Sequence, residues 1–288
     1  MVVVLKGVSI EAKACVNDVC VEHASPTSTL LTDIAQELGS DGSTSYIGAV
    51  DKIVLAYNDG SSVTEYSDLS WSISSGDWTE GVGITCTDTN GDGYADMCKC
   101  GSNYVCKTAT ASGSKTVNLL RAYSGSKLYF EISFNNTTVN DGQDVRVCFY
   151  ISAKITVDES VTTISPLSME DHAYVLLLRK KLTTDNSVKV IVATAKFWDN
   201  TQTQISGSLS ISRHVSGTTA TIHLYFTPDG DPSETVAVYK VNVYPDTTNT
   251  GVSDGLGFVT WDMNSNSSSL VLRKGVTNQV DIVFNVGE

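Results

Sequence analysis

At 288 residues the chain is long enough for one large domain or two ordinary ones, each with a buried core. Only 18% of the residues are charged, below the usual share of about a quarter, and Ser, Thr, Asn and Gly take their place. The formal net charge of -13 argues against a nucleic-acid partner or an anionic membrane surface, because phosphate binding needs clustered Lys and Arg. We therefore expect no nucleic-acid partner.

The first part of the chain predicts strands around a single helix. Residues 2–21 alternate apolar and polar side chains, which is typical of one or two strands. Residues 29–38 place apolar side chains at helical spacing, and Gly39 ends that pattern. Further strands are expected at residues 46–57 (a pair, or one bent strand), 63–73 and 78–85. A cysteine-rich insert follows at residues 86–106.

The clearest strand signal lies in residues 116–155. Apolar side chains alternate with polar ones over residues 127–134 and again over 145–155, so each segment is predicted as a strand with one buried face. Turn-forming residues fill 135–138 and 140–142 between them. The stretch therefore predicts an antiparallel meander that closes a first domain near Val157.

A polar segment ending in proline, residues 158–166, is the best candidate for a linker. Short strands are predicted beyond it at residues 173–179, 187–197, 206–214, 219–226, 234–243, 257–263, 269–273 and 279–286. The fold class predicted is all-β, with two tandem β-sandwich or jelly-roll-like domains. The first domain spans residues 1–158 and contains the helix and the insert, and the second spans 166–288.

Residues 29–155 resemble the β-rich domains of tail-fibre and tail-appendage proteins of phages and archaeal viruses. The likeness rests on a short helix over 30–38, an opening strand with Tyr46-Ile47-Gly48-Ala49-Val50, and closing strands with alternating apolar residues. Tyr57-Asn58-Asp59-Gly60 stands where those domains usually have a glycine after the opening strand. The resemblance implies a virion structural protein.

No apolar run is long enough for a transmembrane helix, so we expect no membrane insertion. The segment 1–6 is too short for a targeting sequence, and we expect a chain without a leader. A hydroxyl-rich surface on such a chain suits a virion protein, which assembles inside the cell and leaves with the particle. The expected location is the virion or the extracellular space.

Seven cysteines stand at positions 15, 20, 86, 98, 100, 106 and 148. The predicted disulfides, each across a short loop, are Cys15–Cys20, Cys86–Cys98 and Cys100–Cys106, with Cys148 left free. Sequence alone does not determine the connectivity, and a zinc site formed by Cys98, Cys100 and Cys106 is the alternative. Disulfides in a chain without a leader indicate a hyperthermophilic host.

Residues 88–96 form the most specific motif of the chain, DTNGDGYAD. Oxygen-bearing residues stand at positions 1, 3, 5 and 9 of this loop, and glycine at position 6, as in calcium-binding loops. Lys99 replaces the glutamate of an EF-hand, so the loop resembles the shorter calcium loops of integrin α-chains and thrombospondin type 3 repeats. The predicted calcium ligands are Asp88, Asn90, Asp92, Asp96 and the carbonyl of Tyr94. The alternative is an acidic turn without a metal.

No catalytic motif of the GxSxG, HExxH, Walker or GxGxxG type is present in the sequence. Among the scattered histidines, His214 and His223 fall on adjacent predicted strands, although ordinary strand positions explain them better. The tryptophans Trp71, Trp78, Trp198 and Trp261 suit either a sugar-binding platform or, more simply, core packing. We therefore predict no catalytic residues, no organic cofactor and no enzymatic activity.

The function predicted first is a structural subunit of a virion tail, turret, vertex or fibre base, which self-assembles and contacts a host surface. Its expected partners are copies of itself, other virion or filament proteins and a host-surface glycan. One alternative is a calcium-dependent subunit of an extracellular filament or surface layer. Another is a carbohydrate-binding module.

Overall fold

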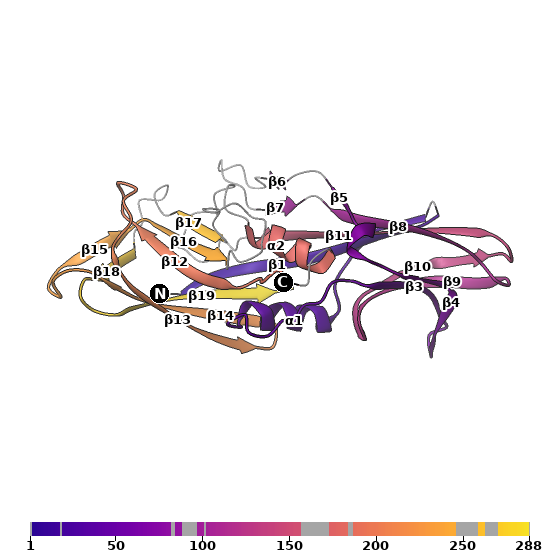
Figure 1. Cartoon of the computed structure of the whole chain (residues 1–288), viewed down its shortest axis with the longest axis horizontal. Coiled ribbons are helices and arrows are strands. Elements are labelled where there is room, and N and C mark those ends of the chain that lie inside the picture. The colour runs from indigo at the N-terminus through magenta and orange to yellow at the C-terminus, as the bar shows by residue number, and fades with distance from the viewer. Residues whose placement is uncertain are drawn as a thin grey trace.

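The computed structural model describes residues 2–17, 19–81, 84–87, 97–100, 102–156, 173–183, 187–245, 259–262 and 270–287. Strands account for 60% of the structure and helices for 10%, so the predicted all-β class is confirmed. The molecule is elongated, with one strand-rich lobe at each end and two helices between them (Figure 1).

The elements follow one another from β1 to β19. The strands are β1 Val2–Val16, β2 Val19–Ala24, β3 Lys52–Asn58, β4 Val63–Ser72, β5 Thr79–Glu80, β6 Ile84–Thr87, β7 Met97–Cys100, β8 Asn103–Thr110, β9 Lys115–Ser124, β10 Lys127–Val139, β11 Asp144–Thr156, β12 Val192–Trp198, β13 Gly207–Ser216, β14 Thr219–Pro228, β15 Thr235–Val238, β16 Lys240–Pro245, β17 Val259–Asp262, β18 Leu270–Arg273 and β19 Asn278–Val286. The helices are α1 Ser28–Leu38, the 3-10 turn η1 Ser75–Asp77 and α2 Ala173–Thr183.

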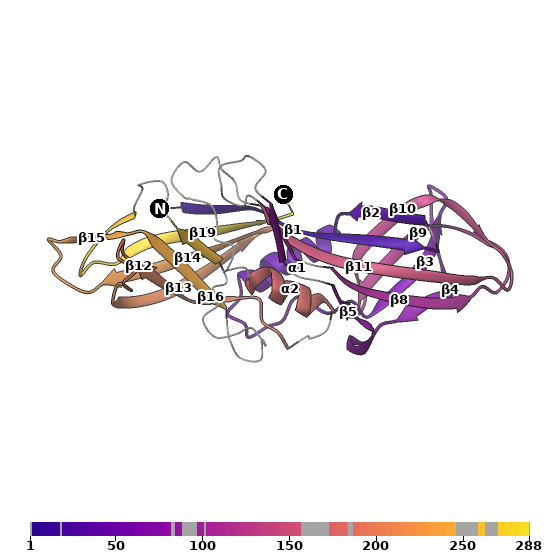
Figure 2. The same ribbon diagram turned by 90° about the horizontal axis from the view of Figure 1, so that it is seen from above.

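One strand, β1, belongs to both lobes. Its first part pairs in parallel with β19, from Val2 opposite Asp281 to Leu5 opposite Phe284. The register with β19 then shifts before Val8 opposite Val286, and from Val8 to Val16 the strand pairs antiparallel with β11 on its other side. A ten-stranded sheet, ordered β13-β14-β19-β1-β11-β7-β6 with β2, β5 and β8 attached, therefore runs along the molecule (Figure 2). It contains strands from both predicted domains, and the predicted linker at 158–166 lies outside the described residues.

The first lobe is a sandwich of this long sheet with the four-stranded sheet β10-β9-β3-β4. Phe149 of β11 is fully buried between them, with the ring of Phe130 from β10 at 5.6 Å and that of Trp78 at 6.2 Å, both edge-on. Such edge-to-face aromatic contacts add to the hydrophobic energy of burial. They hold the two layers together.

The second lobe contains β13, β14 and β19 of the long sheet, the three-stranded sheet β12-β16-β17 and the two-stranded sheet β15-β18. Phe197 of β12 stacks on Phe226 of β14 with 4.2 Å between ring centroids. Alternate residues of β14 and β19 are buried, as expected for strands with one face on a core. The lobe is therefore a second sandwich that shares its main sheet with the first.

Two strand predictions in the first half are wrong at their edges. Residues 135–138 form no turn, because β10 continues to Val139 and turns only at Asn140. Residues 46–51 form no strand, and β3 begins at Lys52. The backbone N–H of Tyr46 donates to the Glu37 carboxylate at 2.8 Å instead of joining a ladder.

The prediction of a strand at residues 173–179 is wrong, since this segment begins α2. The buried positions Leu177, Leu178, Lys181 and Leu182 follow helical spacing. Because one of the four is a lysine, the apolar pattern of the sequence stops after Leu178 and looks like a short strand. The predicted helix at 29–38 is confirmed as α1, with Leu30, Ile34 and Leu38 fully buried.

A buried ion pair joins the two helices. Lys181 of α2 and Glu37 of α1 are each 1% exposed, with 2.8 Å between Nζ and Oε1. Lys181 also donates to the Val188 carbonyl at 2.5 Å, and the second carboxylate oxygen accepts from the Tyr46 backbone. Nearby, the Asn103 amide of β8 donates to the Thr183 hydroxyl at 2.8 Å. Polar contacts thus anchor α2 to the rest of the molecule.

The buried Glu37–Lys181 ion pair leads to a prediction about stability. We expect Lys181→Met to lower the free energy of unfolding by about 3–5 kcal/mol, because it leaves the Glu37 charge buried without its partner. The double variant Glu37→Gln, Lys181→Met should recover most of that loss, since no buried charge remains and the Gln oxygen still accepts from Tyr46. Urea unfolding followed by circular dichroism measures both.

The matched control is Lys127→Met, which breaks the Lys127–Asp33 pair of 2.7 Å while Lys127 is 45% exposed. The Asp33 side chain is itself only 11% exposed but keeps the hydrogen bond from the Tyr129 hydroxyl at 3.0 Å, so we expect a loss of about 1–2 kcal/mol, smaller than that of Lys181→Met. Equal losses for the Lys181 and Lys127 variants, or a double variant no better than Lys181→Met, would contradict the buried-pair interpretation.

Candidate assembly surface

Strand β13 ends the long sheet and forms a regular edge. It pairs with β14 without a register shift, from Gly207 opposite Pro228 to Ser216 opposite Thr219. Within the described ranges, no strand pairs with its other side. An edge of this kind presents a row of backbone N–H and C=O groups that can template another strand.

The side chains of β13 fit an edge that a neighbour covers. One face carries small or uncharged exposed side chains, namely Ser208, Ser210, Ser212, His214 and Ser216. On the other face Leu209, Ile211 and Val215 are only half-buried, whereas their partners on β14 are fully buried. An added strand would therefore complete the burial of apolar side chains that the lobe alone leaves partly in water.

The edge strand of the first lobe, β4, is different. Its acidic residues Glu65 and Asp68 form ion pairs, Glu65 with Lys52 and Arg121 and Asp68 with Lys115. Although partial desolvation opposes it, the hydrogen bonds from Lys115 and the Ser112 backbone lower the pKa of Asp68. The register with β3 also shifts within the strand. Charges and irregular pairing are the usual protection of an edge, and β4 has both.

Arg213 fixes the position of β13. Its guanidinium turns toward the sandwich and donates to the Val192 carbonyl of β12 at 2.7 Å. Burial lowers the pKa of Arg213, although the Asp41 carboxylate opposes this. The contact ties the edge strand to the opposite layer and holds it straight.

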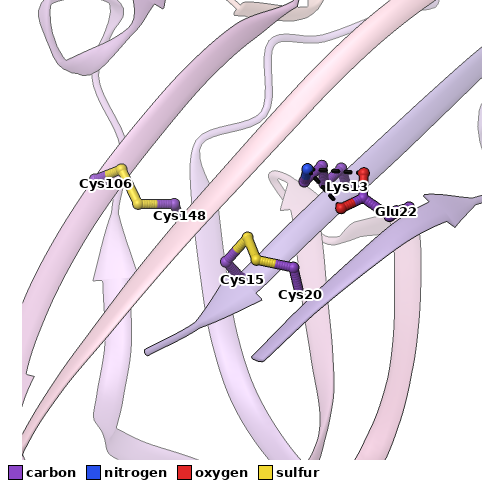
Figure 3. Close-up of a disulfide and its surroundings, with 6 residues drawn as sticks. All are labelled: Lys13, Cys15, Cys20, Glu22, Cys106 and Cys148. Carbon is purple, nitrogen blue, oxygen red and sulfur yellow. Dashed lines mark hydrogen bonds and ion pairs between the residues drawn. A yellow bond between two sulfur atoms is a disulfide. The ribbon is translucent and has the colours of Figure 1, made fainter. Parts of the chain in front are cut away.

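Four cysteines form one row across the first lobe. The register places Cys20 of β2 opposite Cys15 of β1, Cys15 opposite Cys148 of β11, and Cys148 opposite Cys106 of β8. Two disulfides close this row side by side, Cys15–Cys20 and Cys106–Cys148 (Figure 3). The Cα separations of 4.0 and 4.1 Å suit residues directly opposite each other on neighbouring strands.

The predicted connectivity is confirmed only in part. Cys15–Cys20 is confirmed, but the prediction of a Cys100–Cys106 bond with Cys148 free is wrong, because Cys106 bonds Cys148. The prediction paired cysteines that are close in the sequence, whereas the register of β8 with β11 places Cys106 opposite Cys148. The backbone places Cys86 opposite Cys98, but their side chains lie outside the described part of the structure.

The predicted calcium ligands Asp88, Asn90, Asp92, Tyr94 and Asp96 lie outside the described residues. The hairpin that carries this loop is described, and Thr87 of β6 pairs with Met97 of β7. The residues that flank 88–96 on either side are therefore paired with each other. Among the residues that the structure does describe, no group of three or more His, Cys, Asp or Glu side chains is arranged to hold a metal ion.

The three histidines in the described part of the chain do not form one cluster. His23 is exposed and 3.6 Å from the Glu11 carboxylate, and His172 lies outside the described residues. His214 and His223 share a face of the β13–β14 pair, as predicted for adjacent strands, but only diagonally, because their partners are Thr221 and Ser212.

His223 has its contacts on the other side, toward β19. Its Nδ1 is 2.7 Å from Asp281, opposite it in the register. Although desolvation opposes it, hydrogen bonds from Gln279 and His223 lower the pKa of Asp281. We interpret this group as a cross-strand contact on the open face of the sheet.

The tryptophans follow the core-packing alternative where their side chains are described. Trp71 and Trp78 are 9% and 8% exposed and belong to the hydrophobic core. The indole nitrogen of Trp198 is also buried, and the side chain of Trp261 lies outside the described part. The three described tryptophans therefore form no exposed sugar-binding platform.

No protein family model, curated protein or solved structure matches the chain. In the described part, no helix is long and apolar enough to cross a membrane. The two disulfides fit an extracellular or other non-cytoplasmic location.

The two disulfides should contribute unequally to stability. Cys106 and Cys148 are 42 residues apart and Cys15 and Cys20 only 5 apart, so closing the longer loop restricts the unfolded chain more. We expect the double variant Cys106→Ala, Cys148→Ala to lose about 4 kcal/mol of unfolding free energy and Cys15→Ala, Cys20→Ala about 2 kcal/mol. Urea unfolding without reductant measures the difference.

Peptide mapping of the unreduced protein provides the control for this comparison. It should recover peptides linked through Cys15–Cys20 and through Cys106–Cys148. Recovery of a Cys100–Cys106 peptide, or a larger loss on removing the Cys15–Cys20 bond, would contradict the assignment.

Proposed function

We propose that the protein is a non-enzymatic structural subunit that self-associates through β13, as part of a virion appendage such as a tail, turret, vertex or fibre base. The observation that carries the proposal is the regular edge of β13, with an exposed face of serines and His214 and, on the other face, the half-buried Leu209, Ile211 and Val215. The resemblance of residues 29–155 to viral tail-appendage domains supports the virion setting, as do the hydroxyl-rich composition and the disulfides.

A second copy of β13 is the partner that best fits this edge. Two identical strands pair antiparallel about a two-fold axis, and such isologous contacts are the commonest route to a dimer. With the axis near Ile211, residue 210 of one copy faces residue 212 of the other. Both are serines, so the pairing brings no like charges together, and the two long sheets become one continuous sheet.

Calcium has a structural role in this proposal. Asp88, Asn90, Asp92, Asp96 and the Tyr94 carbonyl would supply hard oxygen ligands, which calcium prefers. The pairing of the flanking residues Thr87 and Met97 supports this, because a coordination loop needs the chain on its two sides close together. Bound calcium would stabilise the connection between two short strands.

Charges placed on the β13 edge test the self-association. We expect the wild-type chain to form a dimer or larger assembly, and the variant Ser210→Lys, Ser212→Lys to remain monomeric, because four lysines would meet across the two-fold axis. Sedimentation velocity over a range of protein concentrations measures the change, and negative-stain images distinguish closed assemblies from the open fibres of a surface filament.

The matched control adds the same charge to the other edge, as Thr64→Lys, Ser67→Lys on β4, where both positions are exposed. It should associate like the wild type. A wild-type protein that stays monomeric at every concentration would refute the proposal, and so would an equal effect of the two double variants.

Calcium removal tests the loop. We expect added calcium to raise the melting temperature and a chelator to lower it again, while Asp92→Asn removes most of the response, because it deletes a ligand charge. Asp229→Asn, in another acidic glycine turn, is the control and should respond like the wild type. A melting temperature that calcium and chelator leave unchanged would exclude the site.

A further inference from the structure

A cavity of about 420 Å³ lies on the outer face of the first lobe, far along the sheet from β13. Small-molecule sites range from roughly 300 to 1,000 Å³, so its size suits a small ligand. The residues that line it come from β1, β2, β8, β11 and the segments beside β5 and β8. All of these residues are described, and none of them belongs to β13.

Its floor is built by consecutive rows of the sheet. The register places Lys13, Tyr150 and Tyr104 in one row across β1, β11 and β8. The next row holds Glu11 opposite Ser152. On the other side of the tyrosine row comes the row of four cysteines, so both disulfides border the cavity floor and fix the spacing of its strands.

The two tyrosines form an aromatic platform. Their rings stack with 5.4 Å between centroids and 29° between planes, and both residues are half-buried. The Lys13 ammonium lies 5.8 Å from the centre of the Tyr150 ring. Partly exposed aromatic rings beside hydrogen-bonding groups can pack against the apolar C–H face of a ligand.

Charged and hydroxyl groups surround this platform. Glu22 holds the Lys13 ammonium at 2.7 Å, and His23 is 3.6 Å from Glu11 (Figure 3 shows Lys13 and Glu22). Ser152 is 8% exposed at the floor. Two carboxylates against one ammonium leave the lining net acidic when the histidine is neutral. An anionic ligand is therefore disfavoured.

The rim depends on a glycine. A Cβ on Gly81 would lie 2.0 Å from the Ser102 carbonyl oxygen, closer than any side chain can approach. Gly81 and Ser102 both line the cavity, so this close backbone approach forms one of its walls. The wall, the platform and the acidic groups together make a shaped site.

We propose that this cavity binds an uncharged saccharide, with one ring stacked on Tyr104 and Tyr150 and its hydroxyls bound by Glu11, Glu22 and Lys13. A sugar ring has an apolar C–H face that can pack against the tyrosines. Its hydroxyls can donate to the carboxylates and accept from the ammonium. The site supplies a host-facing contact for the proposed structural subunit, but it does not depend on self-association.

The test is a glycan array probed with the full-length chain, followed by isothermal titration with the neutral oligosaccharides that bind. Tyr150→Ala should weaken binding about tenfold or more by removing the stacking surface. Tyr150→Phe should retain most of the affinity, and Glu11→Gln should weaken it. Tyr225→Ala, a half-buried tyrosine on the outer face of β14, is the matched control and should bind normally.

Several outcomes would overturn the proposal. They are a failure of all neutral saccharides to bind, a preference for acidic saccharides, and equal affinity of the wild type and Tyr150→Ala. Circular dichroism and mapping of the two disulfides establish that each variant is folded. The variant Ser210→Lys, Ser212→Lys should still bind, so a failure of the assembly proposal and a failure of the saccharide proposal remain distinguishable.

Discussion

The structure depends on the double pairing of β1. This strand pairs with β19 over Val2–Leu5 and with β11 over Val8–Val16. Separating the two lobes would therefore require breaking one of these two ladders. The antiparallel ladder with β11 begins at Val8, where the ladder with β19 resumes after its register shift, so β1 continues from one lobe into the other within a single sheet. The lobes are thereby parts of one ten-stranded sheet, and the two surfaces proposed as functional lie at different places along it.

The region between the lobes contains a buried ion pair within a largely apolar core. Two leucines could fill the space that Glu37 and Lys181 occupy. A buried ion pair adds little net stability relative to apolar side chains of similar volume. The pair instead favours one specific arrangement of the segments around it. The carboxylate fixes the Tyr46 backbone and the ammonium fixes the Val188 carbonyl, so the two helices and two irregular segments have a single arrangement in which every charge is satisfied.

The sequence predicted the elements whose pattern is local. Helix α1 and the alternation in β10 and β11 follow from side chains that all obey one period. Helix α2 was missed because Lys181 lies on its buried face, and its partner Glu37 is far away in the sequence. The Cys106–Cys148 bond was missed because it depends on the register of two strands 42 residues apart.

The candidate sites likewise depend on the pairing of strands, which the local sequence pattern does not reveal. Alternation predicted β13 as a strand at 206–214, but only the sheet order reveals that it is an edge. Tyr104 and Tyr150 carry no motif, and only the pairing of β8 with β11 brings their rings together. The signal available in the sequence was their position two residues before Cys106 and two after Cys148, on the same face as both cysteines.

The parallel pairing of β1 with β19 also has a mechanical consequence. Val2 begins one strand and Val286 ends the other, so tension applied between these two points pulls the strands along their axes in opposite directions. The hydrogen bonds of the pair are then loaded together in shear instead of opening one after another. A chain built this way transmits force through its sheet without first extending, and the Cys106–Cys148 bond keeps the intervening strands β9 and β10 out of the stretched path.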